Sequence, residues 1–150
     1  MTLEEAIKSS KFKDQRHKAL IHIMYAAYQV KTNINQLLKN YALTGEQYNV
    51  LRILKGSHPT PLCVKDIASR LIERNSNVPR IADRLEIKKL VKRFPSPEDR
   101  RETLIQITPA GLNLLDAATQ AMEAEHQHIA NLTEAEAAQL NLLLAQMLQD

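Results

Sequence analysis

The side chains of this 150-residue sequence that could do chemistry are the arginines and amides grouped in "RNSNVPRIADR" and an arginine pair in "EDRRE". A guanidinium can donate two parallel hydrogen bonds to guanine, an asparagine amide can pair with adenine, and any cation can neutralise a phosphate. These residue types are suited to recognising a polyanion and its bases. The sequence contains no Ser/His/Asp arrangement, glycine-rich phosphate loop or CxxC pair, so we expect no enzyme activity.

The polar residues in the middle of the sequence divide into two expected roles. Base-edge contacts are expected from the groove-facing start of a helix near residue 76 and from its arginines, namely Ser76, Asn77, Val78, Arg80 and Arg84. Phosphate contacts, which position a protein without reading sequence, are expected from Lys65, Arg74, Lys92 and Arg93. For Arg84, an ion pair on the helix surface with Asp83 or with neighbours of Lys88 is an equal alternative.

The stretch "KRFPSPEDRRETLIQIT", residues 92–108, predicts an exposed and highly charged hairpin. Its tip presents Arg100 and Arg101, which suits phosphates or a narrow, electronegative minor groove. Asp99 is expected to hold an arginine in one orientation through a bidentate pair. The alternative is a solvated turn whose charges keep an edge hairpin from aggregating.

Helices must position these side chains, and the apolar periodicity predicts them. A heptad seam runs along residues 20–41 through Leu20, Ile23, Ala27, Val30, Ile34, Leu37 and Tyr41. Thr44 with Gln47 forms a capping box that opens a second helix, ending near Gly56. A helix pair follows at residues 63–72 and 75–90. The second helix of the pair is expected to be capped by Ser76, with Val78, Ile81, Ala82 and Leu85 facing inward.

Two further helices are expected after the hairpin. Thr108 followed by Pro109 is a strong helix start, and this helix is expected to run to about residue 129. Thr133 with Glu136 forms a second capping box, and the last helix shows an apolar face. A helix, a turn, a second helix and a two-stranded hairpin, in this order, are typical of a winged helix-turn-helix.

Composition and charge limit the class of protein. The apolar content of 44% suffices for a core, and no stretch approaches the ~18 apolar residues of a membrane span. The first 108 residues carry all 20 Lys and Arg against 11 carboxylates, whereas residues 109–150 carry only carboxylates. One part of the chain therefore suits an anion and the other part a different partner. A single cysteine and the lack of a signal sequence lead us to expect a cytoplasmic protein without membrane contact.

Other candidate chemistry is weaker. His126 and His128 lie two residues apart on a helix, so they cannot easily share a metal ion, and we expect no metal and no cofactor. Cys63 is expected to be a small buried residue rather than a redox sensor. His22, Tyr25 and Tyr48 could line a pocket for a small aromatic or anionic effector, or could be core and interface residues.

At the residues quoted so far the chain resembles the MarR (multiple antibiotic resistance regulator) family. The resemblance covers roughly residues 12–150 and rests on "LTGEQYNVLRIL", "IASRL", "SNVPRIADRLEIKKLVKR" and "EDRRETLIQITPAG". It implies a mainly α fold with a small β-hairpin wing, as a single domain. The winged helix-turn-helix lobe would span about residues 44–108, and the dimerisation helices about 12–41 and 109–150.

The resemblance also implies a homodimeric regulator, usually a repressor, that binds double-stranded DNA and carries a small-molecule pocket beside the dimer interface. One position departs from the family pattern, because Lys89 stands where the family usually has glycine. Lys89 is therefore expected to adopt a left-handed conformation or to end the helix in another way. Two alternatives remain open: a winged-helix interaction module that no longer binds DNA, and a metal- or thiol-dependent sensor.

Overall fold

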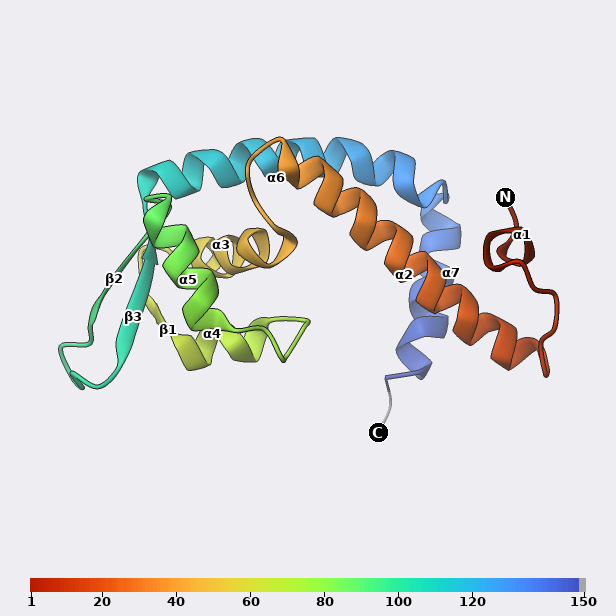
Figure 1. Cartoon of the computed structure of the whole chain (residues 1–150), viewed down its shortest axis with the longest axis horizontal. Coiled ribbons are helices and arrows are strands. Elements are labelled where there is room, and N and C mark those ends of the chain that lie inside the picture. The colour runs from red at the N-terminus through yellow and green to blue at the C-terminus, as the bar shows by residue number, and fades with distance from the viewer. Residues whose placement is uncertain (149–150) are drawn as a thin grey trace.

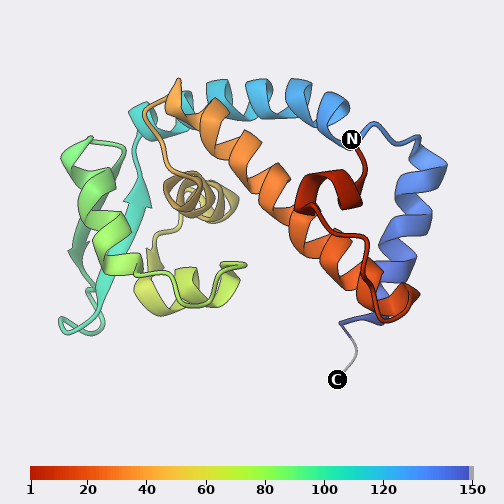
Figure 2. The same ribbon diagram turned by 45° about the vertical axis from the view of Figure 1, so that its right-hand side comes forward.

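The computed structural model describes residues 1–148, apart from the side chains of residues 127–130. Two long helices connect the winged lobe at one end of the molecule with the last helix at the other end (Figures 1 and 2). The helices are α1 (Leu3–Ile7), α2 (Gln15–Lys39), α3 (Gly45–Ser57), α4 (Val64–Arg70), α5 (Val78–Ile87), α6 (Pro109–Ala130) and α7 (Glu134–Gln146). The strands are β1 (Leu62–Cys63), β2 (Val91–Pro95) and β3 (Thr103–Ile107).

The helix starts predicted from the sequence are confirmed where the cap is a threonine. The Thr44 hydroxyl accepts from the Gln47 backbone and the Gln47 side chain accepts from the Thr44 backbone, which completes the capping box of α3. The capping box of α7 is complete in the same way, and Thr108 caps α6 ahead of Pro109. Each cap satisfies amide groups that the first helical turn leaves without a partner.

The sheet has three antiparallel strands in the order β1-β3-β2, one more than the sequence predicted. Leu62 and Cys63 pair with Ile105 and Leu104, and β1 thereby covers the edge of β3 opposite β2. A two-residue strand is too short to show an alternating pattern in the sequence, and the prediction that Cys63 begins the following helix is therefore one residue early. The short helix α1 was also not predicted; its Leu3 is buried and its Glu4 binds Lys18 of α2 at 2.5 Å.

The core is centred on α3, which packs against helices α2, α4, α5 and α6 and against β3. Its largest fully buried side chains are Leu38, Leu51, Leu54, Ile67, Leu85, Ile105 and Leu115. Of the predicted heptad seam, the C-terminal part packs onto this core, whereas Leu20 and Val30 are exposed. No helix in the described part of the chain is long and apolar enough to cross a bilayer.

Helix α5 ends at Ile87, earlier than the residue-90 boundary predicted, and the reason is Lys89. Lys89 has a φ of 61°, as predicted for a residue in a position usually held by glycine. The Leu90 amide donates to the Leu85 carbonyl and the Lys89 amide to Glu86, which is the hydrogen-bond pattern of a Schellman cap. The chain therefore turns sharply into β2 without glycine.

Candidate nucleic-acid interface and effector cavity

The cap of α5 is Asn77, not Ser76 as predicted. Asn77 Oδ1 accepts from the Arg80 amide at 3.2 Å, whereas Ser76 Oγ lies 3.4 Å from Oε1 of Glu46 on α3. The Asn77 oxygen is thus used by the helix, and its amide nitrogen is the group left for a base edge. Ser76 instead lies at the contact between the turn and α3.

Val78 is 1% exposed, so the prediction that it contacts a base is wrong. The α-helical period places residues 78, 81, 82 and 85 on one face, and all four are buried in the core. The opposite face presents Arg80 and Arg84 to solvent. Together with Asn77 and Glu46, these two arginines line a shallow depression of about 420 Å³.

Arg93 holds the wing to α5. Its guanidinium lies 2.5 Å from Asp83 and 3.1 Å from Glu86, and its backbone amide donates to Glu86 at 3.0 Å. Arg93 lowers the pKa of Glu86, chiefly through the side-chain hydrogen bond, and the pKa of Arg93 is raised by the same bond. This pairing argues against the predicted phosphate contact of Arg93. It also occupies the Asp83 carboxylate that was the alternative partner of Arg84, which forms no ion pair within the described residues.

Backbone contacts fix the tip of the wing. Ser96 is buried, and its hydroxyl accepts from the amides of Glu98 and Asp99. Asp99 Oδ1 accepts from the backbone amide of Arg101 at 3.0 Å. The expected bidentate pair with a guanidinium is therefore wrong, because Asp99 shapes the turn itself. Arg100 and Arg101 are exposed, which leaves both side chains directed into solvent.

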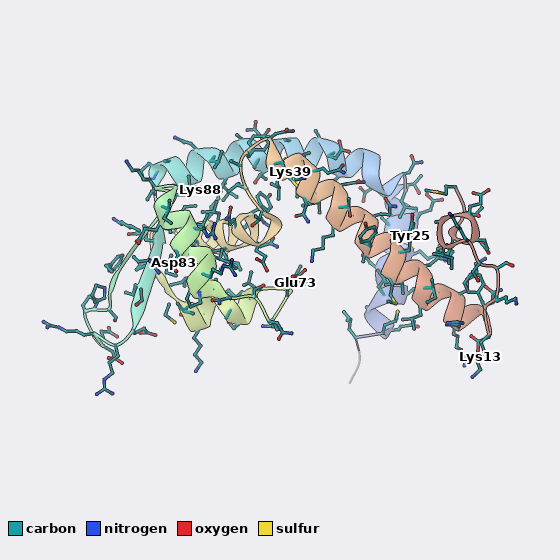
Figure 3. The ribbon with its side chains drawn as sticks, viewed as in Figure 1. Lys13, Tyr25, Lys39, Glu73, Asp83 and Lys88 are labelled. Carbon is teal, nitrogen blue, oxygen red and sulfur yellow. The ribbon has the colours of Figure 1, made fainter. Side chains whose placement is uncertain are left out.

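The remaining predicted phosphate contacts differ in their surroundings. Lys65 and Lys92 are exposed on α4 and β2. Arg74 is exposed but donates to the Ser69 carbonyl, which ties the turn after α4 back onto that helix. Lys88, at the end of α5, donates to the Ala42 carbonyl and to Gln47 Oε1 at 3.0 Å, so this lysine faces the α2–α3 junction (Figure 3). Sequence reasoning missed these internal roles, because a basic residue looks the same whether it binds DNA or a carbonyl.

A cavity of about 940 Å³ lies between the two long helices and the winged lobe. His22 and Tyr48 are among its lining residues, and Tyr48 also belongs to the buried core. Tyr25 does not line the cavity: its hydroxyl accepts from Gln29 Nε2 at 2.8 Å and its ring lies against Tyr28. The surface of the lining is mostly apolar, and its residues come from α2, α3, α6, α7 and the α4–α5 turn. Its charged and titratable lining residues are His22, Lys31, Glu46, Arg52, Glu73 and His126.

The residues considered for metal or redox chemistry are His126, His128 and Cys63. Among the described residues no group of three or more His, Cys, Asp or Glu side chains could hold a metal ion. His126 lines the cavity, and the side chain of His128 lies outside the described residues. Cys63 is buried, and burial raises its pKa, which opposes formation of the reactive thiolate.

Comparisons with known proteins agree with this geometry. The MarR family profile matches residues 43–103. The HTH-type transcriptional regulator PrsX of Escherichia coli is 32% identical over 80% of this chain and 75% of its own length. BpsR of Bordetella bronchiseptica, whose DNA binding is regulated by 6-hydroxynicotinic acid, is 26% identical, with a TM-score of 0.74 over 87% of this chain and 99% of BpsR.

Escherichia coli MarR has been solved with and without DNA. A mutant complexed with operator DNA is 25% identical, with a TM-score of 0.80 over 93% of this chain and all of MarR. The DNA-free wild type gives 0.70 over 94% of this chain. The family match, the curated relative and the shared winged helix together establish that the chain belongs to the MarR family of transcriptional regulators.

Proposed function

We propose that the chain is a homodimeric repressor that reads a pseudo-palindromic DNA operator and responds to a small effector. The observation that carries the proposal is the outward face of α5. It presents Arg80 and Arg84, which have no carboxylate partner within the described residues, beside a wing whose tip is fixed by backbone hydrogen bonds. A rigid helix with unpaired guanidinium groups suits the major groove, and a basic hairpin suits the adjacent backbone or minor groove.

The contacts that we propose follow the corrected geometry. Base edges are read by Asn77, Arg80 and Arg84. Phosphates are bound by Lys65, Lys92, Arg100 and Arg101, all of which are exposed. Ser76, Asp99 and Arg93 position these groups through Glu46, the Arg101 amide and α5. Because the proposed target is chromosomal DNA, we place the protein in the cytoplasm.

The dimer is supported by apolar surface that the single chain leaves uncovered. Large apolar side chains are exposed along the N-terminal part of α2 and along α7, and they are Leu20, Met24, Tyr28, Leu140, Leu142, Leu143, Met147 and Leu148. Burying such faces against a second copy removes them from water. A two-fold dimer would read two half-sites about 34–36 Å apart. Sedimentation at micromolar concentration should give twice the chain mass, and a stable monomer would contradict the proposal.

The cavity supports an effector that is small and aromatic or anionic. The surface of its walls is mainly apolar and therefore suits an aromatic ring, while Arg52 can receive a negative group. It lies between α2, which we place at the dimer interface, and the α4–α5 turn, which leads into the recognition helix. Occupancy of the cavity could thus alter the distance between α2 and the winged lobe.

Two arginine variants test the DNA-binding face. The operator is first selected from a random duplex library, and affinities are then measured by fluorescence anisotropy across a salt series. Arg80→Ala should cost about 1–3 kcal/mol on the operator and relax preference at one position per half-site. Arg101→Ala should weaken operator and scrambled DNA alike, and should lower the salt slope by about one charge per subunit.

The exception is an A-tract beneath the wing, where Arg101 could read groove width and contribute specificity. Asp116→Asn is the control, because Asp116 lies on α6 and pairs with Lys55 on α3, outside the proposed interface. If neither arginine variant changes binding relative to this control, the proposed DNA face is wrong.

A further inference from the structure

The winged lobe contacts α2 at the C-terminal end of that helix, and the cavity separates the two nearer the N-terminus of α2. Helix α2 packs mainly against α3 and α6. At its C-terminal end, Lys88 of α5 binds the Ala42 carbonyl and Gln47, so the end of the recognition helix is fixed to the α2–α3 junction. Nearer its N-terminus, α2 and the turn between α4 and α5 form opposite walls of the cavity. The winged lobe is therefore fixed to α2 at the α2–α3 junction, and the cavity lies between them beyond that junction.

One ion pair crosses that space. Lys31 Nζ of α2 donates to Glu73 Oε1, which lies in the α4–α5 turn, and both residues line the cavity. Figure 3 shows Glu73 on the side of the turn that faces α2. Within the described residues, this is the polar link between α2 and the turn, and its two residues are 42 positions apart in the sequence. Glu73 raises the pKa of Lys31, chiefly through this hydrogen bond.

The chain resembles the operator complex of E. coli MarR with a TM-score of 0.80 and the DNA-free form with 0.70. The Lys31–Glu73 pair joins two opposite walls of the cavity in the arrangement that the structure shows. We propose that this pair is a strut across the cavity, and that Lys31 and Glu73 position the recognition helix for the operator without touching it. This inference rests on the proposed function.

The ion pair of each subunit is expected to make only a small contribution to operator affinity. Both side chains are more than half exposed, at 63% and 53%, so solvent screens their attraction. An exposed pair that is present in one lobe arrangement and absent in another should change affinity by about two- to fivefold per subunit. A dimer contains the pair twice, which brings the effect within the range of an anisotropy titration.

Single-charge variants separate a strut from a general charge effect, because the two predict different signs. Without a strut, Glu73→Gln removes a negative charge from the DNA-binding lobe and should tighten binding to a polyanion, while Lys31→Gln should weaken it. With the strut, both variants weaken operator binding, since either one removes the pair. Affinities are measured on the selected operator at one fixed salt concentration.

The charge-reversed double variant Lys31→Glu with Glu73→Lys completes the test. It keeps the net charge and restores an ion pair, so operator affinity should return to within about twofold of the wild type. The Lys55–Asp116 pair is the matched control: it joins α3 to α6, is similarly exposed at 48% and 52%, and does not line the cavity. Lys55→Gln should leave operator affinity within twofold, and circular dichroism melts check that every variant is folded.

The outcomes are distinct. Weakening by both single variants with rescue by the reversed pair supports the strut. Opposite effects of the two single variants, no effect of either, or a reversed pair no better than the singles would overturn it. If the wild type itself binds no selected duplex more tightly than scrambled DNA, the proposed function fails and not the strut alone.

Discussion

The change Gly111→Ala should destabilise the protein, because the added methyl group would collide with fixed backbone at the base of the wing. Gly111 lies in the first turn of α6, where a Cβ atom would stand 2.2 Å from the Leu90 carbonyl oxygen and 2.8 Å from Ile107 Cγ1. The Leu90 oxygen is backbone and already accepts from the Thr108 amide at 3.0 Å, so it cannot move without breaking that bond. The contact links the start of α6 to the base of the wing.

The expected magnitude follows from two opposing effects. Overpacking typically costs about 1–3 kcal/mol, and a clash with fixed backbone belongs at the upper end. Alanine recovers up to about 1 kcal/mol because it is a better helix former than glycine. The net loss should be about 2 kcal/mol, which corresponds to roughly 4–8 °C in Tm for a chain of this length.

Gly56→Ala is the matched control for this measurement. Gly56 also lies in a helix, α3, but a Cβ there meets nothing within 4 Å. Its replacement should be neutral or stabilise by up to about 1 kcal/mol. Both variants are compared with the wild type by urea denaturation at one protein concentration, since unfolding of a dimer depends on concentration. Equal stability of Gly111→Ala and the wild type would refute the close packing of α6 on Leu90.

Three further outcomes are expected. Lys89→Gly should be neutral or stabilise by up to about 1 kcal/mol in urea denaturation, because relief of a left-handed conformation outweighs the entropy of glycine; a loss would contradict the αL assignment. Glu86 has a folded-state pKa below its ordinary 4.5, so its bond to Arg93 stabilises the fold above that pH and is lost as the pH falls through the folded pKa. Acid titration of Glu86→Gln should show a smaller loss of stability than the wild type. Cys63, whose pKa is raised by burial, should react with iodoacetamide more slowly in the native protein than in urea, and equal rates would argue against burial.

The sequence predicted those features that depend on local pattern. Threonine caps, the Thr108-Pro109 helix start and the αL conformation of Lys89 each follow from one or two residues and their neighbours. The order of helices and the hairpin follow from apolar periodicity. Strand β1 did not, because its two residues acquire strand geometry only by pairing with β3.

The errors in the predicted site have a common physical origin. Val78 was assigned to a base because it opens the helix, although the same periodicity that places Leu85 in the core also places Val78 there. Asp99 and Arg93 were assigned by charge, whereas their partners are set by the turn of the wing and by the approach of β2 to α5. A sequence shows which groups can form ion pairs. Only the fold shows which carboxylates come within reach.

The basic residues of the winged lobe therefore fall into two classes that composition cannot separate. Arg93 and Lys88 bind carboxylates or carbonyls, and they fix the wing to α5 and the end of α5 to the α2–α3 junction. Arg80 and Arg101 are exposed and keep their guanidinium groups for a partner. The first class costs the protein some electrostatic attraction to DNA, since each paired cation is partly neutralised. These paired residues instead fix the orientation of the exposed arginines. Base recognition requires a fixed orientation, because a bidentate contact to one base tolerates little change in angle.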